Sequence, residues 1–126
     1  MADERTENAA QAAVDAGLKV HRTLGPGLLE SAYEHCLAYE LAERGIKVER
    51  QVFLPVFYGR LKLDASYRLD IVIDQVLIIE IKAVDVLLPL HHAQILTYLR
   101  LSQLQLGLLM NFNVALFKQG LKRIAL

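Results

Sequence analysis

Residues 67–82 read YRLDIVIDQVLIIEIK, a run of mostly apolar and β-branched residues that contains three acids and ends on a lysine. Such a composition predicts two strands, Tyr67–Ile73 and Val76–Val84, because β-branched residues fit a pleated sheet. A tight turn around Asp74-Gln75 would join them.

Three polar side chains of this strand pair are candidate catalytic residues: Asp70, Glu80 and Lys82. Side chains alternate between the faces of a strand, so Glu80 and Lys82 share one face. If Asp70 faces the same side, two carboxylates converge beside one lysine. Such carboxylates repel each other unless a divalent cation lies between them, and Mg²⁺ prefers oxygen ligands of this kind. The lysine would hold an attacking water or stabilise charge developing on a phosphate.

This arrangement places a demand on the turn. Asp70 lies opposite Glu80 only if the loop has an odd length or contains a bulge near Asp74–Val76. A two-residue turn would put the carboxylates on opposite faces and undermine the site. The alternative interpretation is an exposed Glu-x-Lys ion pair, which contributes under roughly 1 kcal/mol.

The rest of the chain supplies helices and strands on both sides of this pair. Apolar spacing, with glycine or proline at the ends, predicts helices at Thr6–Leu24 (with Thr6 as cap), Leu28–Arg44 and Leu90–Leu101. Strands are predicted from Val48 to the Tyr58-Gly59 turn, at Leu104–Asn111 and within Val114–Ala125. A helix between the third and fourth strands implies a mixed sheet flanked by helices, hence a single α/β domain over residues 1–126.

The composition narrows the class of protein. The 126 residues carry 14 basic and 14 acidic side chains, are 54% hydrophobic and include one cysteine. These values exclude a disordered chain and an internal disulfide framework, and they favour a reducing compartment, so we expect a cytoplasmic protein. No signal sequence and no uncharged apolar run of about 18 residues is present, so we expect no membrane association. Residues 1–46 carry a net charge of −4 and residues 47–126 one of +4, a polarity that suits a phosphate-bearing substrate.

Several segments together resemble the GxxExxY proteins, a family within the PD-(D/E)XK nuclease superfamily. The matching segments are HRTLGPG at 21–27, the motif Gly27, Glu30 and Tyr33, then Tyr67–Asp70, Glu80-Ile81-Lys82, QILTYL at 94–99 and GLLMNF at 107–112. They follow the family's order and spacing over nearly the whole chain. The resemblance implies a restriction-endonuclease-like core: a mixed four-stranded sheet flanked by helices, here in the order α-α-β-β-β-α-β with a short C-terminal strand.

The resemblance also implies roles for individual residues. Asp70 corresponds to the metal-binding aspartate, Glu80 to the second carboxylate and Lys82 to the catalytic lysine. Glu30 corresponds to a helix-borne acid that completes the metal shell, and the backbone carbonyl of Ile81 would add a ligand. The position before Asp70 is Leu69 rather than the proline of the superfamily's name, a replacement that is widespread.

Five further residues are expected to support the site. Gln94 and Tyr98 share a helix face and resemble the glutamine and tyrosine that some members place beside it. Tyr33 is expected to pack with its hydroxyl near the site. His21 would either orient Glu30 or pack, and Arg68 adds a cation two residues before Asp70.

The leading hypothesis is a Mg²⁺- or Mn²⁺-dependent nuclease that hydrolyses phosphodiester bonds of nucleic acid, with DNA as the expected substrate. One alternative is a noncatalytic nucleic-acid-binding or regulatory module that retains the nuclease fold. Another is a structural, self-associating protein. A homodimer is also expected, because cutting a duplex often uses two active sites.

Overall fold

The computed structural model describes residues 2–63 and 67–126. The helices are α1 (Glu4–Leu24), α2 (Glu30–Glu43), α3 (Pro89–Ser102) and α4 (Phe117–Gly120). The strands are β1 (Val48–Leu54), β2 (Phe57–Tyr58), β3 (Leu61–Lys62), β4 (Tyr67–Ile73), β5 (Leu77–Lys82), β6 (Leu106–Asn111) and β7 (Leu121–Ala125). None of the helices in these described ranges is long and apolar enough to cross a bilayer.

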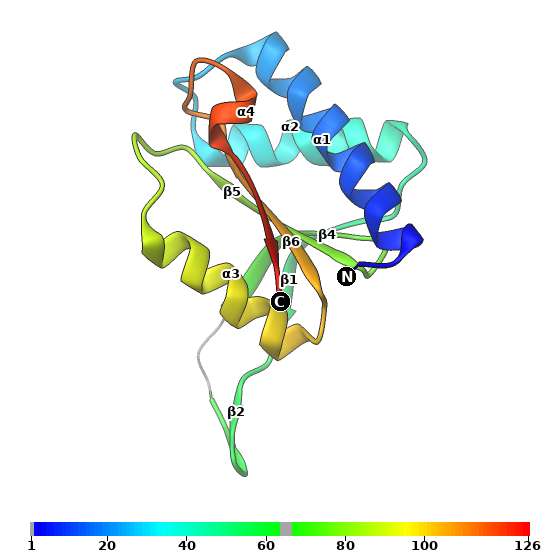
Figure 1. Ribbon diagram of the computed structural model, residues 1–126, viewed down its shortest axis with the longest axis vertical. Coiled ribbons are helices and arrows are strands. Elements are labelled where there is room, and N and C mark those ends of the chain that lie inside the picture. The colour runs from blue at the N-terminus through cyan, green and yellow to red at the C-terminus, as the bar shows by residue number, and fades with distance from the viewer. Residues whose placement is uncertain (1, 64–66) are drawn as a thin grey trace.

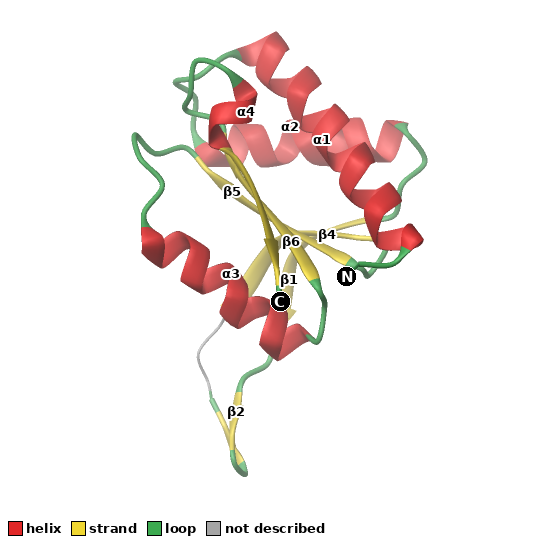
Figure 2. Ribbon diagram, viewed as in Figure 1, coloured by secondary structure: helices red, strands yellow, loops and turns green. Residues whose placement is uncertain are grey.

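The core is a five-stranded sheet in the order β1-β4-β5-β6-β7. Only β5 and β6 run parallel, and α3 provides the crossover between them; the other neighbouring pairs are antiparallel. Strands β2 and β3 form a separate hairpin that projects from the domain (Figure 2). The predicted α/β architecture with a mixed sheet is therefore confirmed.

Helices cover both faces of this sheet (Figure 1). On one face, α1, α2 and α4 bury side chains such as Ala13, Leu37 and Phe117 against Ile71 and Ile79. We call this the α2 face. On the other, which we call the α3 face, Ile95 and Leu99 of α3 pack on inward side chains of the strands, with Ile78 and Leu109 among them. A side chain's position along a strand thus decides which helical layer it meets.

The turn between β4 and β5 has the odd length that a shared face for Asp70 and Glu80 requires. Ile73 pairs with Leu77 and Ile71 with Ile79, which leaves residues 74–76 as a three-residue connection. Asp74 and Gln75 take left-handed backbone conformations, with φ of 48° and 59°, and Val76 N donates to Ile73 O at 2.9 Å. This register brings Asp70 opposite Glu80.

Three local predictions need correction. The first helix begins at Glu4, and its cap is Asp3, whose Oδ1 accepts from the amide of Thr6 at 2.8 Å; Thr6 itself is not the cap. The strand expected to continue from Val48 to Tyr58 ends at Leu54, because Pro55 fixes its own φ and lacks an N–H. The C-terminal segment forms the short helix α4 before its strand.

Gly120 gives the first test of this packing. It is buried where α4 passes into β7, and a Cβ at this position would collide with the backbone of Asn111 at the end of β6. We therefore expect Gly120→Ala to lower the free energy of unfolding by about 1–3 kcal/mol, measured by urea denaturation. Lys118→Ala, on the exposed side of α4, is the control and should change it by less than about 0.5 kcal/mol. An unchanged G120A midpoint would contradict the close approach.

Candidate active site

Strands β4 and β5 separate at Asp70. Their pairing ends at Ile71 and Ile79, although both strands continue beyond these residues. The Asp70 carboxylate replaces the next backbone contact: its Oδ2 accepts from Ile81 N at 2.9 Å. The amide of Asp70 in turn donates to Glu80 Oε1 at 3.4 Å. Both carboxyl groups are therefore held at the point where the two central strands part.

The backbone twists at this point in two neighbouring strands. Leu69 and Val72 both pack in the cluster of the α3 face, although a spacing of three would place them on opposite faces of a regular strand. In β1, Val52 belongs to the same cluster, whereas Arg50 reaches Glu34 of α2 on the other face. Gln51 lies between them with a left-handed φ of 50°. This uncommon conformation for a non-glycine residue lies directly beside Asp70.

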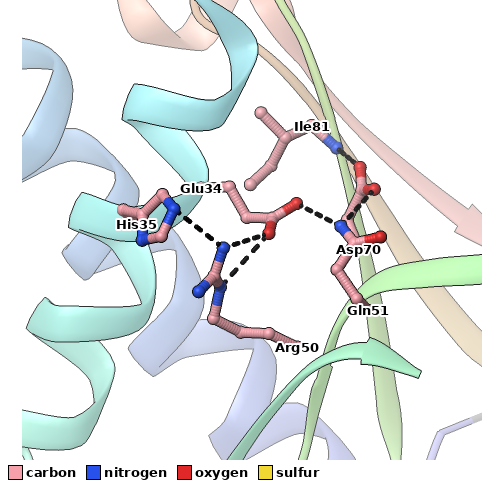
Figure 3. A network of polar contacts seen from close by, with 6 residues as sticks. All are labelled: Glu34, His35, Arg50, Gln51, Asp70 and Ile81. Carbon is pink, nitrogen blue, oxygen red and sulfur yellow. Dashed lines mark hydrogen bonds and ion pairs between the residues drawn. The ribbon is translucent and has the colours of Figure 1, made fainter.

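A polar network ties Asp70 to α2 (Figure 3). Glu34 is buried and accepts from Arg50 through Nε at 3.2 Å and Nη2 at 2.6 Å. Gln51 Nε2 donates to Glu34 Oε1 at 2.8 Å and also lies 3.4 Å from Asp70 Oδ1. The amide of Gln51 therefore bridges a buried, charge-compensated glutamate and the candidate catalytic aspartate.

The Glu80 carboxyl is strongly perturbed. The pKa of Glu80 is raised to about 9, first by burial and then by the hydrogen-bonding contact with Asp70 and the negative charge of Asp70, while the backbone amide of Asp70 and the Lys82 ammonium oppose the shift. Two carboxyl groups this close cannot both ionise readily in a site with little water. At neutral pH the pair holds a proton in place of a second negative charge.

Glu30 faces the same site from the first residue of α2. The surrounding protein removes water from its carboxyl and so raises its pKa, with a further increase from the charge of Asp70. Lys82 and the amide of Ala83 oppose this shift. Even so, no group of three or more Asp, Glu, His or Cys side chains within residues 2–63 and 67–126 is arranged to hold a metal ion. Asp70 and Glu80 form a close pair, and Glu30 lies near it at the exposed rim.

Helix α3 contributes Tyr98 from the α3 face of the sheet, opposite the face that α2 covers. Burial raises the pKa of the Tyr98 hydroxyl, and the charges of Glu80, Asp70 and Tyr67 raise it further, so the phenol lies within electrostatic reach of the carboxyl pair. Gln94 lies one turn earlier on the same helix and is half-buried.

The comparison with known protein families agrees with this geometry. A family model described as the PD-(D/E)XK nuclease superfamily matches residues 7–124. The chain belongs to the PD-(D/E)XK nuclease superfamily. No curated protein and no solved structure matches the chain.

The donor set of this PD-(D/E)XK domain fits a divalent cation. Asp70 and Glu80 supply adjacent carboxylates whose mutual repulsion a cation would relieve, as the high pKa of Glu80 indicates. The N–H and C=O of one strand residue point to the same side, and Ile81 N donates to Asp70. The carbonyl of Ile81 is thus directed toward the same gap between β4 and β5.

Tyr33 and His21 occupy packing positions in this domain. The Tyr33 hydroxyl donates to Gly25 O at 2.6 Å and accepts from Leu28 N at 3.1 Å, while its ring stacks on Phe112 with centroids 4.6 Å apart. It therefore fixes the glycine-rich turn that leads into Glu30. His21 is buried, with Nε2 2.7 Å from Val114 O, so the structure places it in packing.

Arg68 lies at the outer part of β4. Its guanidinium carbon is 5.9 Å from the ring centroid of Phe53, the residue paired with it in β1. This cation–π arrangement is exposed and lies two residues before Asp70.

Glu34, Arg50 and Gln51 are site residues that the sequence alone did not predict. In the sequence, Glu34 is recognisable only as an acid one helical turn after Glu30, an arrangement that is ordinary for an exposed helix face. Gln51 carries no signal, because a left-handed residue within a strand cannot be seen in the composition of that strand.

Glu80 gives a test in the absence of metal. Its folded-state pKa lies above the ordinary value of 4.5, so between about pH 5 and pH 9 the folded protein binds more protons than the unfolded chain. The free energy of unfolding should therefore fall as pH rises through this range, with a slope against pH that corresponds to nearly one proton. Glu80→Gln should flatten this dependence. Denaturation in chelator at several pH values between about 5 and 9 measures this dependence. Glu43→Gln, at an exposed position of α2, is the control. Parallel profiles for E80Q and the wild type would contradict the assignment.

Proposed function

We propose that this PD-(D/E)XK domain is a metal-dependent nuclease of the GxxExxY type that hydrolyses phosphodiester bonds, with DNA as its substrate and Mg²⁺ or Mn²⁺ as its cofactor. The observation that carries this proposal is the Asp70–Glu80 carboxyl pair, in which Glu80 is buried and Asp70 is half-buried. The pair lies at the split between β4 and β5, within electrostatic reach of Lys82. A pair of this kind is unfavourable without a cation and useful with one.

Each polar residue has a distinct role in this proposal. Asp70, Glu80 and the Ile81 carbonyl would hold the ion, and Glu30 would complete its shell from α2. When bound, the ion supplies Lewis-acid activation of water and stabilises charge on the phosphate. Lys82 would orient the attacking water and stabilise the developing charge, while Tyr98 and Gln94 would flank the site from α3. Gln51 keeps Asp70 oriented through its amide.

Asp70 and Lys82 test the chemistry. With Mn²⁺ and labelled DNA, we expect Asp70→Asn and Lys82→Ala each to lower the cleavage rate by at least about 100-fold, because each removes a metal ligand or a transition-state charge. Lys47→Ala is the matched control: Lys47 is exposed beside the β4–β5 turn, at the other end of these strands. Cleavage that survives in D70N and K82A would have to come from a contaminant, and the proposal would then have no support.

Metal binding can be tested without cleavage. A ligand that binds only the folded state stabilises it by about 2.7 kcal/mol at a concentration 100 times its Kd. We therefore expect Mn²⁺ to raise the melting temperature of the wild type and to leave that of Asp70→Asn nearly unchanged, as measured by differential scanning fluorimetry against a chelator baseline. Nucleic-acid binding with no metal response and no cleavage would instead indicate a noncatalytic module.

Two finer properties complete the proposal. The protein is expected to act in the cytoplasm, and the homodimer stays a prediction that sedimentation at micromolar concentration can test. A monomer at that concentration would exclude the dimer.

A further inference from the structure

The β2–β3 hairpin exposes aromatic side chains that a folded protein would ordinarily bury. Phe57 is 59% exposed and Tyr58 80% exposed, and Leu61 follows on the paired strand at 58%. Tyr33, Phe112 and Phe117, in contrast, are buried in the core. The hairpin projects beyond the sheet and beyond α3 (Figure 1). An exposed apolar group of this kind marks an interaction surface.

Basic residues lie beside these aromatics, and Lys62 pairs with Phe57 across the hairpin. Residues 52–63 contain Arg60 and Lys62 and no acid. Both cations lie on the hairpin itself, Arg60 in its turn and Lys62 in β3, and both are exposed. At the base of the hairpin, Arg68 lies over Phe53. Exposed aromatic rings next to positive charges complement a single strand of nucleic acid, whose bases stack while its phosphates attract cations.

A cleft lies between the base of the hairpin and α3. It has a volume of about 160 Å³ and is lined by Val56 and Tyr67 beside the hairpin and by Thr97, Tyr98 and Leu101 of α3. Tyr67 is 42% exposed, so its ring is accessible from the solvent. Tyr98 borders both this cleft and the surroundings of Asp70 and Glu80. A flat ring held between these tyrosines would lie next to the proposed reaction centre.

We propose that the hairpin Phe57–Lys62 and the cleft between Tyr67 and Tyr98 bind unpaired bases, so that the substrate is single-stranded or locally unpaired nucleic acid. In a duplex the faces of each base are covered by its neighbours, so an exposed aromatic ring can stack only on bases released from the helix. The inference rests on the proposed nuclease function for its class of ligand. Its test measures binding, which is separate from cleavage.

The experiment measures fluorescence anisotropy of the full chain in chelator, with labelled oligothymidine of about 20 nucleotides and a duplex of the same length. We expect the wild type to bind the single strand at least about tenfold more tightly than the duplex. Tyr58→Ala and Tyr67→Leu should each weaken single-strand binding by about 5- to 150-fold, the loss of one stacked base, and leave duplex binding within about twofold. Tyr39→Ala is the matched control, an exposed tyrosine of α2 outside this surface.

Salt dependence tests the basic residues separately. Removing one cation that neutralises a phosphate should reduce the slope of log affinity against log salt by about 0.7 for a single strand, so Arg60→Ala and Lys62→Ala should each lower it by roughly that amount. Circular dichroism and a urea midpoint for every variant confirm that it is folded before its binding is interpreted.

Three results would overturn the inference: equal or tighter binding of the duplex, single-strand affinities of Y58A and Y67L that match the wild type, or a dimer that Y58A dissociates with no change in oligonucleotide binding. The last result would make the hairpin a contact between two copies of this chain. Failure of the proposed nuclease function looks different. In that case Mn²⁺ gives no cleavage of either substrate, whatever the anisotropy measures.

Discussion

The geometry of this domain depends on one interruption in its sheet, the separation of β4 and β5 after the Ile71–Ile79 pair. A regular ladder would direct the next backbone groups toward each other and leave no space between the strands. Here the Asp70 side chain accepts the Ile81 amide, so the backbone donor stays satisfied while the strands part. The interruption lies beside the carboxyl pair, between two strands that are otherwise mostly isoleucine, leucine and valine.

Holding that gap open requires support from outside the two strands. Gln51 adopts a left-handed conformation in β1, and Arg50 and Val52 consequently reach opposite faces of the sheet. A residue in this conformation costs of order 1–3 kcal/mol, so other contacts must maintain it. Its amide bonds to Glu34 provide such a contact, and Tyr33, one residue earlier on α2, fixes the turn before Glu30. Helix α2 thereby positions both sides of the site.

Much of this architecture is predictable because it follows from periodicity. The strand Tyr67–Ile73 and the parallel pair with its helical crossover follow from side-chain alternation and the placement of turn residues. The odd length of the β4–β5 turn is a condition of the proposed site, because the composition around Asp74-Gln75 also suits a two-residue turn. The hairpin after Pro55 is not predictable in the same way, because its strands are two residues long and have no period to detect. The network around Glu34 depends on a single φ angle at Gln51, which alternation cannot reveal.

The choice of glutamine at position 51 follows from the charges around it. Glu34 and Asp70 both present oxygen atoms to this side chain, so the residue between them must donate hydrogen bonds. A glutamate there would add a third carboxylate with no proton to share. A lysine would neutralise Asp70 and compete with a cation for it. A neutral amide holds Asp70 in place and leaves its charge uncompensated, while Arg50 alone balances Glu34. The network therefore orients the aspartate and preserves the negative charge that the proposed cation would need at the split between β4 and β5.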